Sequence, residues 1–271
     1  MFLGLDLGTS GLRGLLVSED GVPVGDHSAS YAVSSPMEGW SEQDPGDWLR
    51  ACADVFGNLR SNFPKEFSAI RGIGVSGHMH GATMLDAAGE TLGPCILWND
   101  GRAWQEAAEL DADPIFREVS GNIVFPGFTA PKLVWVSRNK PEVFSEIDKI
   151  LLPKDYINYW LTGNLATDMS DASGTSWLDT SARNWKVLEV HQCPHSRNCQ
   201  TWLELLQRFQ SNMSTYDTTP DLWANRSDSL PGNLKWLWSN IERASSMKNS
   251  LKPDWPTLPP NYLCPAVFIH D

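Results

Sequence analysis

The 271-residue sequence lacks the features that mark exported, disulfide-bonded and membrane-spanning chains. Its five cysteines form an odd and scattered set, which is not a disulfide framework. No basic segment precedes an apolar run at the start, so no secretory signal is recognised. No uncharged apolar stretch is long enough to span a bilayer. These absences predict a protein of the reducing cytoplasm, with no membrane partner.

Basic residues are also scarce. Lysine and arginine number 21 against 33 aspartates and glutamates, which gives a formal net charge of −12. Such a balance argues against a nucleic-acid partner, because nucleic acids and anionic lipids attract basic surfaces. The hydrophobic content of 41% is ordinary and sufficient for a packed core. Charge alone does not choose among enzyme classes.

Glycine becomes rare in the last third of the chain. Of 21 glycines, only Gly232 follows residue 188. Residues 188–271 are rich in Ser, Asn, Pro and isolated Trp, with candidate helices only at 203–209 and 234–241. We expect two parts: a domain over 1–187, and an irregular tail over 188–271 that is frame-shifted or disordered. The alternative is a divergent but genuine C-terminal subdomain.

Residues 1–187 alternate strand and helix signals. Apolar runs at 2–6, 12–17 and 70–75 predict strands, and Asp20-Gly21 predicts a hairpin turn into a third early strand. Helical signals include Asp44-Pro45, a cap followed by Pro at the first helical position. Further elements are predicted as a short strand at 96–98 and helices at 129–138 and 154–161. The pattern indicates an α/β domain that opens with an antiparallel hairpin set.

The segment from Asp6 to Gly11 is a candidate phosphate-binding hairpin. Gly8 and Gly11 can take positive φ and let backbone amides approach an anion, while Thr9 and Ser10 add hydroxyl donors. A carboxylate from Asp6 beside such amides requires a cation between them, which implies Mg²⁺. The spacing fits neither a Walker loop nor a dinucleotide fingerprint, and a strand follows. The alternative is a plain hairpin turn.

A second candidate site follows the strand at 70–75. If that strand continued, His78 and His80 would share one face and Met79 would point the other way. No third ligand lies nearby, so hydrogen bonding to a polyol is favoured over a metal. Imidazole can donate or accept, and Met79 can pack on the C–H face of a sugar. The alternative is a structural histidine beside a glycine turn.

A third candidate is the segment Trp98-Asn99-Asp100-Gly101-Arg102. It puts an aromatic face and polar groups at the end of a short strand, where open α/β folds often contact ligands. The alternative is that Asp100 caps a helix beginning near Arg102.

Seven motifs in order resemble one family. The chain is similar to the xylulokinases, a group within the FGGY family of carbohydrate kinases, from Met1 to about Val187. The stretch from Gly127 to Asn139 resembles a signature of the whole family, with Lys132 and Trp135 in register. The motifs are D-L-G-T-S-G, W-S-E-Q-D-P, G-H-M-H-G-A, I-L-W-N-D-G-R, G-F-T-A-P-K-L-V-W-V, L-P-K-D-Y and S-D-A-S-G-T.

The resemblance implies an actin-like (ribonuclease H-like) fold, with two domains around a cleft that binds ATP, Mg²⁺ and a ketose. It implies that Asp6 is the acid of the metal and phosphate site, holding Mg²⁺ through water. The residues implied to lie near the transferred phosphate are Gly8, Thr9, Ser10, Gly11 and Arg13. Those implied to contact or line the sugar site are Met79, His80, Trp98, Asn99 and Asp100.

The implied reaction moves the γ-phosphoryl group of ATP to O5 of D-xylulose, giving D-xylulose 5-phosphate in xylose metabolism. In the family, the general base is an Asp of a Gly-Asp-Asn-type motif in the second half, and no such motif occurs in these residues. Gly46-Asp47 is followed by Trp48 and lies at a predicted helix start. We therefore expect a truncated chain that is weakly active or inactive alone. The sequence leaves open whether the chain forms a homodimer.

Three other interpretations remain. The chain is a sugar-binding or regulatory half-kinase, or an FGGY kinase for another ketose or polyol, or a metal protein. The metal interpretation rests on a cluster without standard zinc spacing: His191, Cys193, His195 and Cys199. The tail tryptophans predict exposed apolar surface that promotes aggregation; they are Trp202, Trp223, Trp236, Trp238 and Trp255.

Overall fold

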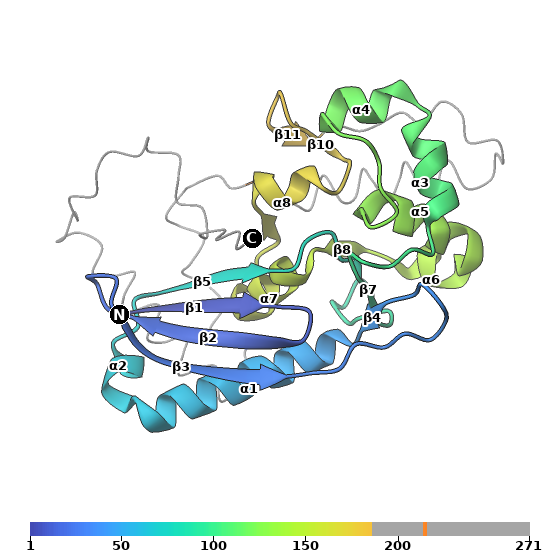
Figure 1. Cartoon of the computed structure of the whole chain (residues 1–271). Helices are drawn as coiled ribbons and strands as arrows, with labels where there is room; N and C mark the ends of the chain where they lie inside the picture. Colours follow the sequence, from blue (N-terminus) through green and yellow to red (C-terminus); the bar gives the residue numbers. More distant parts are fainter. Residues whose placement is uncertain (186–213, 216–271) are drawn as a thin grey trace.

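The computed structural model describes residues 1–185 and 214–215. Its central element is a four-stranded sheet of order β3-β2-β1-β5, with strands β1 (Phe2–Leu7), β2 (Gly11–Val17), β3 (Pro23–Ser30) and β5 (Gly72–Gly77) (Figure 1). The first three strands are mutually antiparallel, and β1 runs parallel to β5. The predicted opening with antiparallel hairpins is confirmed.

Alternating leucines explain how this sheet is buried on one side. In β1, Leu3, Leu5 and Leu7 are buried while the residues between them are exposed. The buried face packs on helix α1 (Pro45–Asn62), which lies along the sheet in Figure 1. The predicted start of this helix is confirmed, because the Asp44 side chain accepts from the Gly46 N–H and Pro45 begins the helix.

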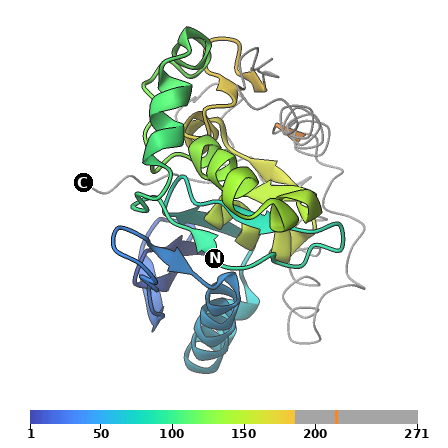
Figure 2. The same ribbon diagram turned by 90° about the vertical axis from the view of Figure 1, so that its right-hand side faces the viewer.

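A second body of short strands and helices continues from the sheet. In the side view of Figure 2, α1 (blue) lies at one end of the molecule and the green helices α3 and α4 at the other. The remaining elements are α2 (Pro64–Ser68), α3 (Trp104–Asp111), α4 (Pro114–Ser120), α5 (Thr129–Asn139), α6 (Pro141–Glu146), α7 (Pro153–Thr162), α8 (Met169–Ser173), β4 (Glu42–Gln43), β6 (Thr83–Leu85), β7 (Cys95–Ile96), β8 (Lys149–Leu151), β9 (Ala166–Thr167), β10 (Leu178–Asp179), β11 (Asn184–Trp185) and β12 (Ser214–Thr215). The predicted helices at 129–138 and 154–161 correspond to α5 and α7.

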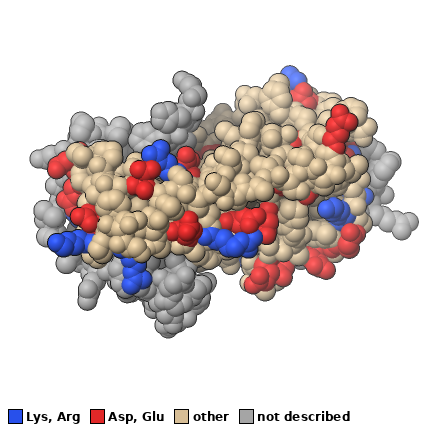
Figure 3. Space-filling view, turned by 60° about the horizontal axis from the view of Figure 1, so that its bottom comes forward, with Lys and Arg blue, Asp and Glu red and all other residues tan. Residues whose placement is uncertain are grey.

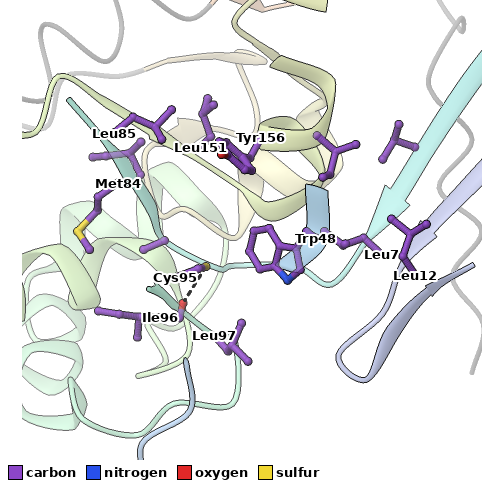
Figure 4. Close-up of a cluster of buried hydrophobic side chains, with 14 of the residues drawn as sticks. Leu7, Leu12, Trp48, Met84, Leu85, Cys95, Ile96, Leu97, Leu151 and Tyr156 are labelled. Atoms are coloured by element: carbon purple, nitrogen blue, oxygen red, sulfur yellow. Dashed lines mark hydrogen bonds between the residues drawn. The ribbon is translucent and has the colours of Figure 1, made fainter. Parts of the chain in front are cut away.

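One hydrophobic core joins the two bodies. Figure 4 shows Trp48 of α1 between the leucines of the β1–β2 hairpin and a group of side chains from the second body. That group includes Tyr156 of α7, Leu85 of β6 and Leu151 of β8. Trp48 is fully buried and its ring meets the Tyr156 ring edge-on, with 6.3 Å between centroids. The sheet and the second body are therefore fixed relative to each other.

Exposed charges of both signs are interspersed on the face shown in Figure 3. Among the described ion pairs, Arg50 lies against both Asp44 and Asp47, and Arg71 pairs with Glu19 at 2.7 Å. Such exposed pairs contribute little to stability. Within the described part of the chain, no helix is both long enough and apolar enough to cross a bilayer.

The predicted tail falls mainly outside the described residues. Within it the structure describes only strand β12, which pairs in parallel with β9. The candidate helices at 203–209 and 234–241 lie outside the described residues, as do the His/Cys cluster and the five tail tryptophans.

Candidate functional site

Two of the predicted site segments leave the sheet side by side. Asp6 is paired in register with Ser76, and Leu7 with Gly77. Past the end of β5, the His78 N–H donates to the Leu7 carbonyl at 2.9 Å. The hairpin and the Met79-His80 turn therefore lie at the carboxyl ends of neighbouring parallel strands, which is where open α/β sheets bind ligands.

The hairpin tip needs glycine for a reason other than the one expected from the sequence. Neither Gly8 nor Gly11 has positive φ. Gly11 is required by close approach instead, because a Cβ there would lie 2.7 Å from the Ala29 carbonyl oxygen of β3. The Gly8 N–H donates to the Gly11 carbonyl at 2.9 Å and closes the tip.

Side chains hold the carbonyl groups of this tip from behind. The Tyr31 hydroxyl donates to the Gly8 carbonyl at 2.6 Å, and Gln43 Nε2 donates to the Thr9 carbonyl at 2.5 Å. Sequence reasoning missed both residues. Gln43 stands in the W-S-E-Q-D-P motif, one of the seven motifs of the family resemblance, whereas no motif includes Tyr31.

Asp6 and Arg13 face the open side of the sheet. They are paired in register across β1 and β2, and both side chains are exposed. The Asp6 carboxylate accepts from Ser76 Oγ at 3.1 Å, while Arg13 pairs with Asp26 at 3.1 Å. An exposed carboxylate with one oxygen engaged fits a contact to Mg²⁺ through water. Since residues 1–185 and 214–215 contain no cluster of three or more metal-ligating side chains, the other ligands would be water and phosphate oxygens.

The Met79-His80 turn differs from the conditional expectation. Strand β5 ends at Gly77, so His78 and His80 do not share a strand face. His78 is buried with its ring 5.5 Å from the Trp48 ring, whereas Met79 is 45% exposed. His80 has φ of +63°, which is uncommon for a residue other than glycine. A strained residue beside an exposed methionine marks this turn as a candidate site.

A buried lysine holds this turn in place. Lys132 Nζ donates to the carbonyl oxygens of His80 at 2.7 Å and Gly127 at 2.6 Å, and Thr129 Oγ1 donates to His80 as well. Burial lowers the pKa of Lys132 to about 7. A neutral amine still carries two N–H groups, enough for both carbonyls.

The His80 ring lies in a close-fitting place. Its centroid is 4.7 Å from that of Phe128, and a Cβ on Gly174 would lie 2.0 Å from the ring. Burial, with a contribution from Lys132, lowers the pKa of His80 to about 4. The imidazole is therefore neutral at pH 7, with one nitrogen able to donate and the other to accept.

Trp98 links the hairpin to the Met79-His80 turn. Its Nε1 donates to Thr9 Oγ1 at 3.3 Å, and its ring is 43% exposed. On its other side, the Trp98 carbonyl packs so closely on Gly127 that a Cβ there would lie 2.1 Å away. Gly127 in turn accepts from Lys132. One connected set of contacts thus runs from Thr9 to His80.

Asn99 is exposed beside Trp98, but Asp100 is buried and engaged. Its oxygens accept from the Ser41 N–H at 2.6 Å and from the Arg102 guanidinium at 2.7 and 2.8 Å. Helix α3 begins only at Trp104, with Ala103 at the cap position, so Asp100 is not its cap. Asp100 holds the loop that presents Trp98 and Asn99.

Two further motifs meet in a buried charge cluster behind the turn. Lys154 of L-P-K-D-Y lies 2.6 Å from Asp155, 2.8 Å from Asp168 and 3.3 Å from Asp171, and all four residues are buried. Burial raises the pKa of Asp171 to about 6. The cluster joins α7 to α8, and α8 leads to the Gly174 on which the His80 ring packs.

The mixed sheet, with a glycine hairpin between its first two strands, defines the class of protein: an α/β domain of the actin-like (ribonuclease H-like) fold. The family model "FGGY family of carbohydrate kinases, N-terminal domain" matches residues 1–219. The chain therefore belongs to the FGGY family of carbohydrate kinases. The match passes the compositional boundary at Val187 and includes strand β12.

Similar proteins include xylulose kinases from several bacteria. The xylulose kinase of Escherichia coli K12 is 46% identical over 199 residues, covering 73% of this chain and 41% of that protein. A crystal structure described as a xyloylose kinase from Brucella ovis has a TM-score of 0.68 and 62% identity, covering 69% of this chain and 39% of that one. The xylulose kinase structure from Rhodospirillum rubrum has a TM-score of 0.66 at 32% identity. The chain thus spans about two fifths of the length of these relatives.

Proposed function

We propose that this chain carries the sugar-binding and phosphate-positioning part of an ATP-dependent kinase that phosphorylates D-xylulose at O5. The observation that carries the proposal is the adjacency of the two turns. The hairpin tip and the Met79-His80 turn leave neighbouring parallel strands, and Trp98 hydrogen-bonds to Thr9 between them. A phosphate donor at one turn would then lie next to a hydroxyl acceptor at the other.

The sugar side of the proposal rests on neutral polar chemistry. The His80 imidazole is uncharged at pH 7, since its pKa is lowered to about 4 by burial. Its Nδ1 is buried, so Nε2 is the nitrogen that would donate to, or accept from, a sugar oxygen, according to the tautomer. Met79 and Trp98 expose apolar surface that suits the C–H faces of a ketose, and Asn99 adds an amide beside them. Asp100 acts from behind by holding the loop.

The phosphate side rests on backbone and charge. Asp6 presents an exposed carboxylate on the same face of the sheet as Arg13, with which it is paired in register. Mg²⁺ bound with ATP would neutralise charge on the phosphate oxygens. The work of this chain is to place the sugar hydroxyl and the phosphate within reach of each other and to keep them there. No Gly-Asp-Asn motif occurs in the 271 residues, so we propose that they transfer phosphate slowly or not at all without a partner base.

The test separates binding from catalysis. D-Xylulose is titrated into the 271-residue chain by calorimetry, with D-gluconate and glycerol as competing polyols, and ADP release is measured with MgATP. We expect D-xylulose to bind and ADP release to stay near background. Met79→Ala should weaken sugar binding by about tenfold, because its apolar contact is lost. Met37→Ala is the matched control, since Met37 is also exposed but is not among the proposed site residues.

Each outcome decides between interpretations. Tighter binding of gluconate or glycerol than of D-xylulose would assign the site to another polyol. ADP release at the rate of a complete kinase would contradict the proposal that this chain lacks an essential part. Binding of none of the three compounds would overturn the proposed sugar site.

A further inference from the structure

Gln43 of the W-S-E-Q-D-P motif hydrogen-bonds to the hairpin tip through its side chain. It is only 1% exposed, although it carries a polar amide. Its Nε2 donates to the Thr9 carbonyl at 2.5 Å, and its Oε1 accepts from Trp48 Nε1 at 3.1 Å. Trp48 is fully buried, so the amide is fixed on both sides. A fully engaged buried amide of this kind specifies one geometry.

The hydrogen bond on the Thr9 carbonyl also fixes the amide that follows it. In a trans peptide, the C=O of one residue and the N–H of the next point in opposite directions across one plane. The Thr9 C=O points inward to Gln43, so the Ser10 N–H points away from the buried side. The Tyr31 hydroxyl fixes the orientation of the preceding peptide, Gly8–Thr9, because it donates to the Gly8 carbonyl. The Thr9 N–H then points away from Tyr31.

Both amides are left without an acceptor. Among residues 1–185 and 214–215, neither the Thr9 N–H nor the Ser10 N–H donates a hydrogen bond to the protein. Backbone amides without an acceptor are rare when buried, but at an exposed tip they are open to a ligand. Two successive outward N–H groups form a concave site for an anion.

We propose that Gln43 is a positioning residue of the phosphate site. It holds the Thr9 peptide so that the Ser10 amide, next to the Thr9 amide, faces the phosphate oxygens. This inference rests on the proposed function, because it takes the hairpin as the phosphate side of the site. Gln43 touches no ligand itself. Its contribution is to keep the Thr9–Ser10 peptide from rotating. Such a rotation would turn the Thr9 carbonyl oxygen toward the anion.

The test uses the full chain labelled with ¹⁵N and inorganic phosphate as the probe. Phosphate is titrated while the Thr9 and Ser10 amide signals are followed by NMR, and D-xylulose is titrated separately. In Gln43→Leu we expect phosphate binding at these amides to weaken about tenfold or more, because the Thr9 carbonyl loses its donor. D-Xylulose binding should change less than twofold, since the variant does not touch the Met79-His80 turn.

A second variant and a control keep the test decisive. Gln43→Glu keeps the size and the acceptor for Trp48, but places a carboxylate oxygen against the Thr9 carbonyl, so it should weaken phosphate binding at least as much. Ser41→Ala is the control, because Ser41 is buried two residues away and its Oγ has no partner in the described structure. It should leave both titrations unchanged.

The outcomes separate this inference from the proposed function. Unchanged phosphate binding in both folded Gln43 variants would overturn the role of Gln43. A wild-type chain that binds D-xylulose without any phosphate-induced shift of Thr9 or Ser10 would also overturn it, while leaving the sugar site intact. A third outcome is that phosphate shifts the Thr9 and Ser10 amide signals, that the Gln43 variants weaken this effect, and that the chain does not bind D-xylulose. This outcome would support the inference and contradict the proposed sugar site. If both variants fail to fold, residual dipolar couplings of the wild-type Ser10 N–H decide whether it points away from Gln43.

Discussion

The two turns of the candidate site are held by different chemistry. At the hairpin tip, neutral donors from Gln43 and Tyr31 bind two successive carbonyls. At the Met79-His80 turn, the buried amine of Lys132 binds the carbonyls of His80 and Gly127. In both arrangements, side-chain donors hydrogen-bond to backbone carbonyl oxygens on the buried side of the turn. The exposed side of the turn is left for a ligand. They differ in whether the donor side chain can change its charge.

That difference has a physical consequence for each side. Burial raises the pKa of the Tyr31 hydroxyl, so it stays protonated through the neutral range, and an amide does not titrate. Burial lowers the pKa of Lys132 to about 7, so its charge changes near neutral pH. The hairpin tip is therefore held independently of pH, whereas the stability of the Met79-His80 turn depends on pH. A neutral hydrogen bond gives up some strength but avoids the cost of burying a charge.

The largest expected effect lies where a backbone atom packs most closely on a glycine. Gly127→Ala would place a Cβ 2.1 Å from the Trp98 carbonyl oxygen, which is backbone and cannot swing away. Gly11→Ala would place one 2.7 Å from the Ala29 carbonyl oxygen on the hairpin side. We expect losses of about 3 kcal/mol or more for Gly127→Ala and about 1–2 kcal/mol for Gly11→Ala, measured by urea unfolding at pH 7.

Gly57→Ala is the control for these two changes. Gly57 lies within α1, and a Cβ added there would have nothing within 4 Å, so the same substitution should stabilise the chain by about 0.5–1 kcal/mol. If Gly11→Ala cost more than Gly127→Ala, the hairpin would be the more tightly packed side, and the comparison would be reversed.

The charge difference is tested by Lys132→Met. Methionine fills similar space but donates nothing, so the Gly127 carbonyl loses this donor and the His80 carbonyl keeps only that of Thr129, and we expect a loss of about 2 kcal/mol at pH 7. The folded pKa of Lys132, about 7, lies below its ordinary value of 10.5, so the native state binds fewer protons than the unfolded state between these values. The stability from Lys132 therefore rises with pH in this window.

The deficit of Lys132→Met relative to the natural chain should accordingly grow by about 2 kcal/mol between pH 7 and pH 9, read from urea curves at both values. Lys65→Met serves as the control, because Lys65 is exposed on α2 and should show no such growth. A deficit that stays constant with pH would mean that Lys132 remains charged when buried, and the contrast between the two turns would disappear.

Local patterns in the sequence were enough to predict the elements that build the site, but not the contacts that hold it. The strand at 2–6 and the Asp44-Pro45 start of α1 follow from a local apolar run and from capping, and both were predicted correctly. The condition that β5 continues through His80 is not met, because β5 ends at Gly77 and His80, held by contacts from Lys132 and Thr129, has positive φ. Such contacts join residues about fifty positions apart, and periodicity carries no information on them.

The same limit explains the individual site residues. Trp98 was expected at the site, and the structure shows its hydrogen bond to Thr9 of the hairpin. Asp100 was expected beside it, and its carboxylate is engaged by Arg102. A carboxylate two residues before an arginine reads the same in the sequence whether it binds a ligand or its neighbour. Only burial of the pair distinguishes the two, and burial depends on Trp40, whose ring lies 3.7 Å from the Arg102 guanidinium carbon.

The smallest expected effect falls on the neutral side. Tyr31→Phe removes only the hydroxyl that donates to the Gly8 carbonyl and keeps the ring, so we expect a loss of about 1 kcal/mol. Because the pKa of Tyr31 is raised, its hydroxyl remains a donor at pH 7 and at pH 9, and the loss should be equal at both values in urea unfolding. Tyr159→Phe is the control, since the Tyr159 hydroxyl makes no hydrogen bond within the described residues. A Tyr31→Phe deficit that changed with pH as strongly as that of Lys132→Met would show that the hairpin side is also coupled to a titrating group.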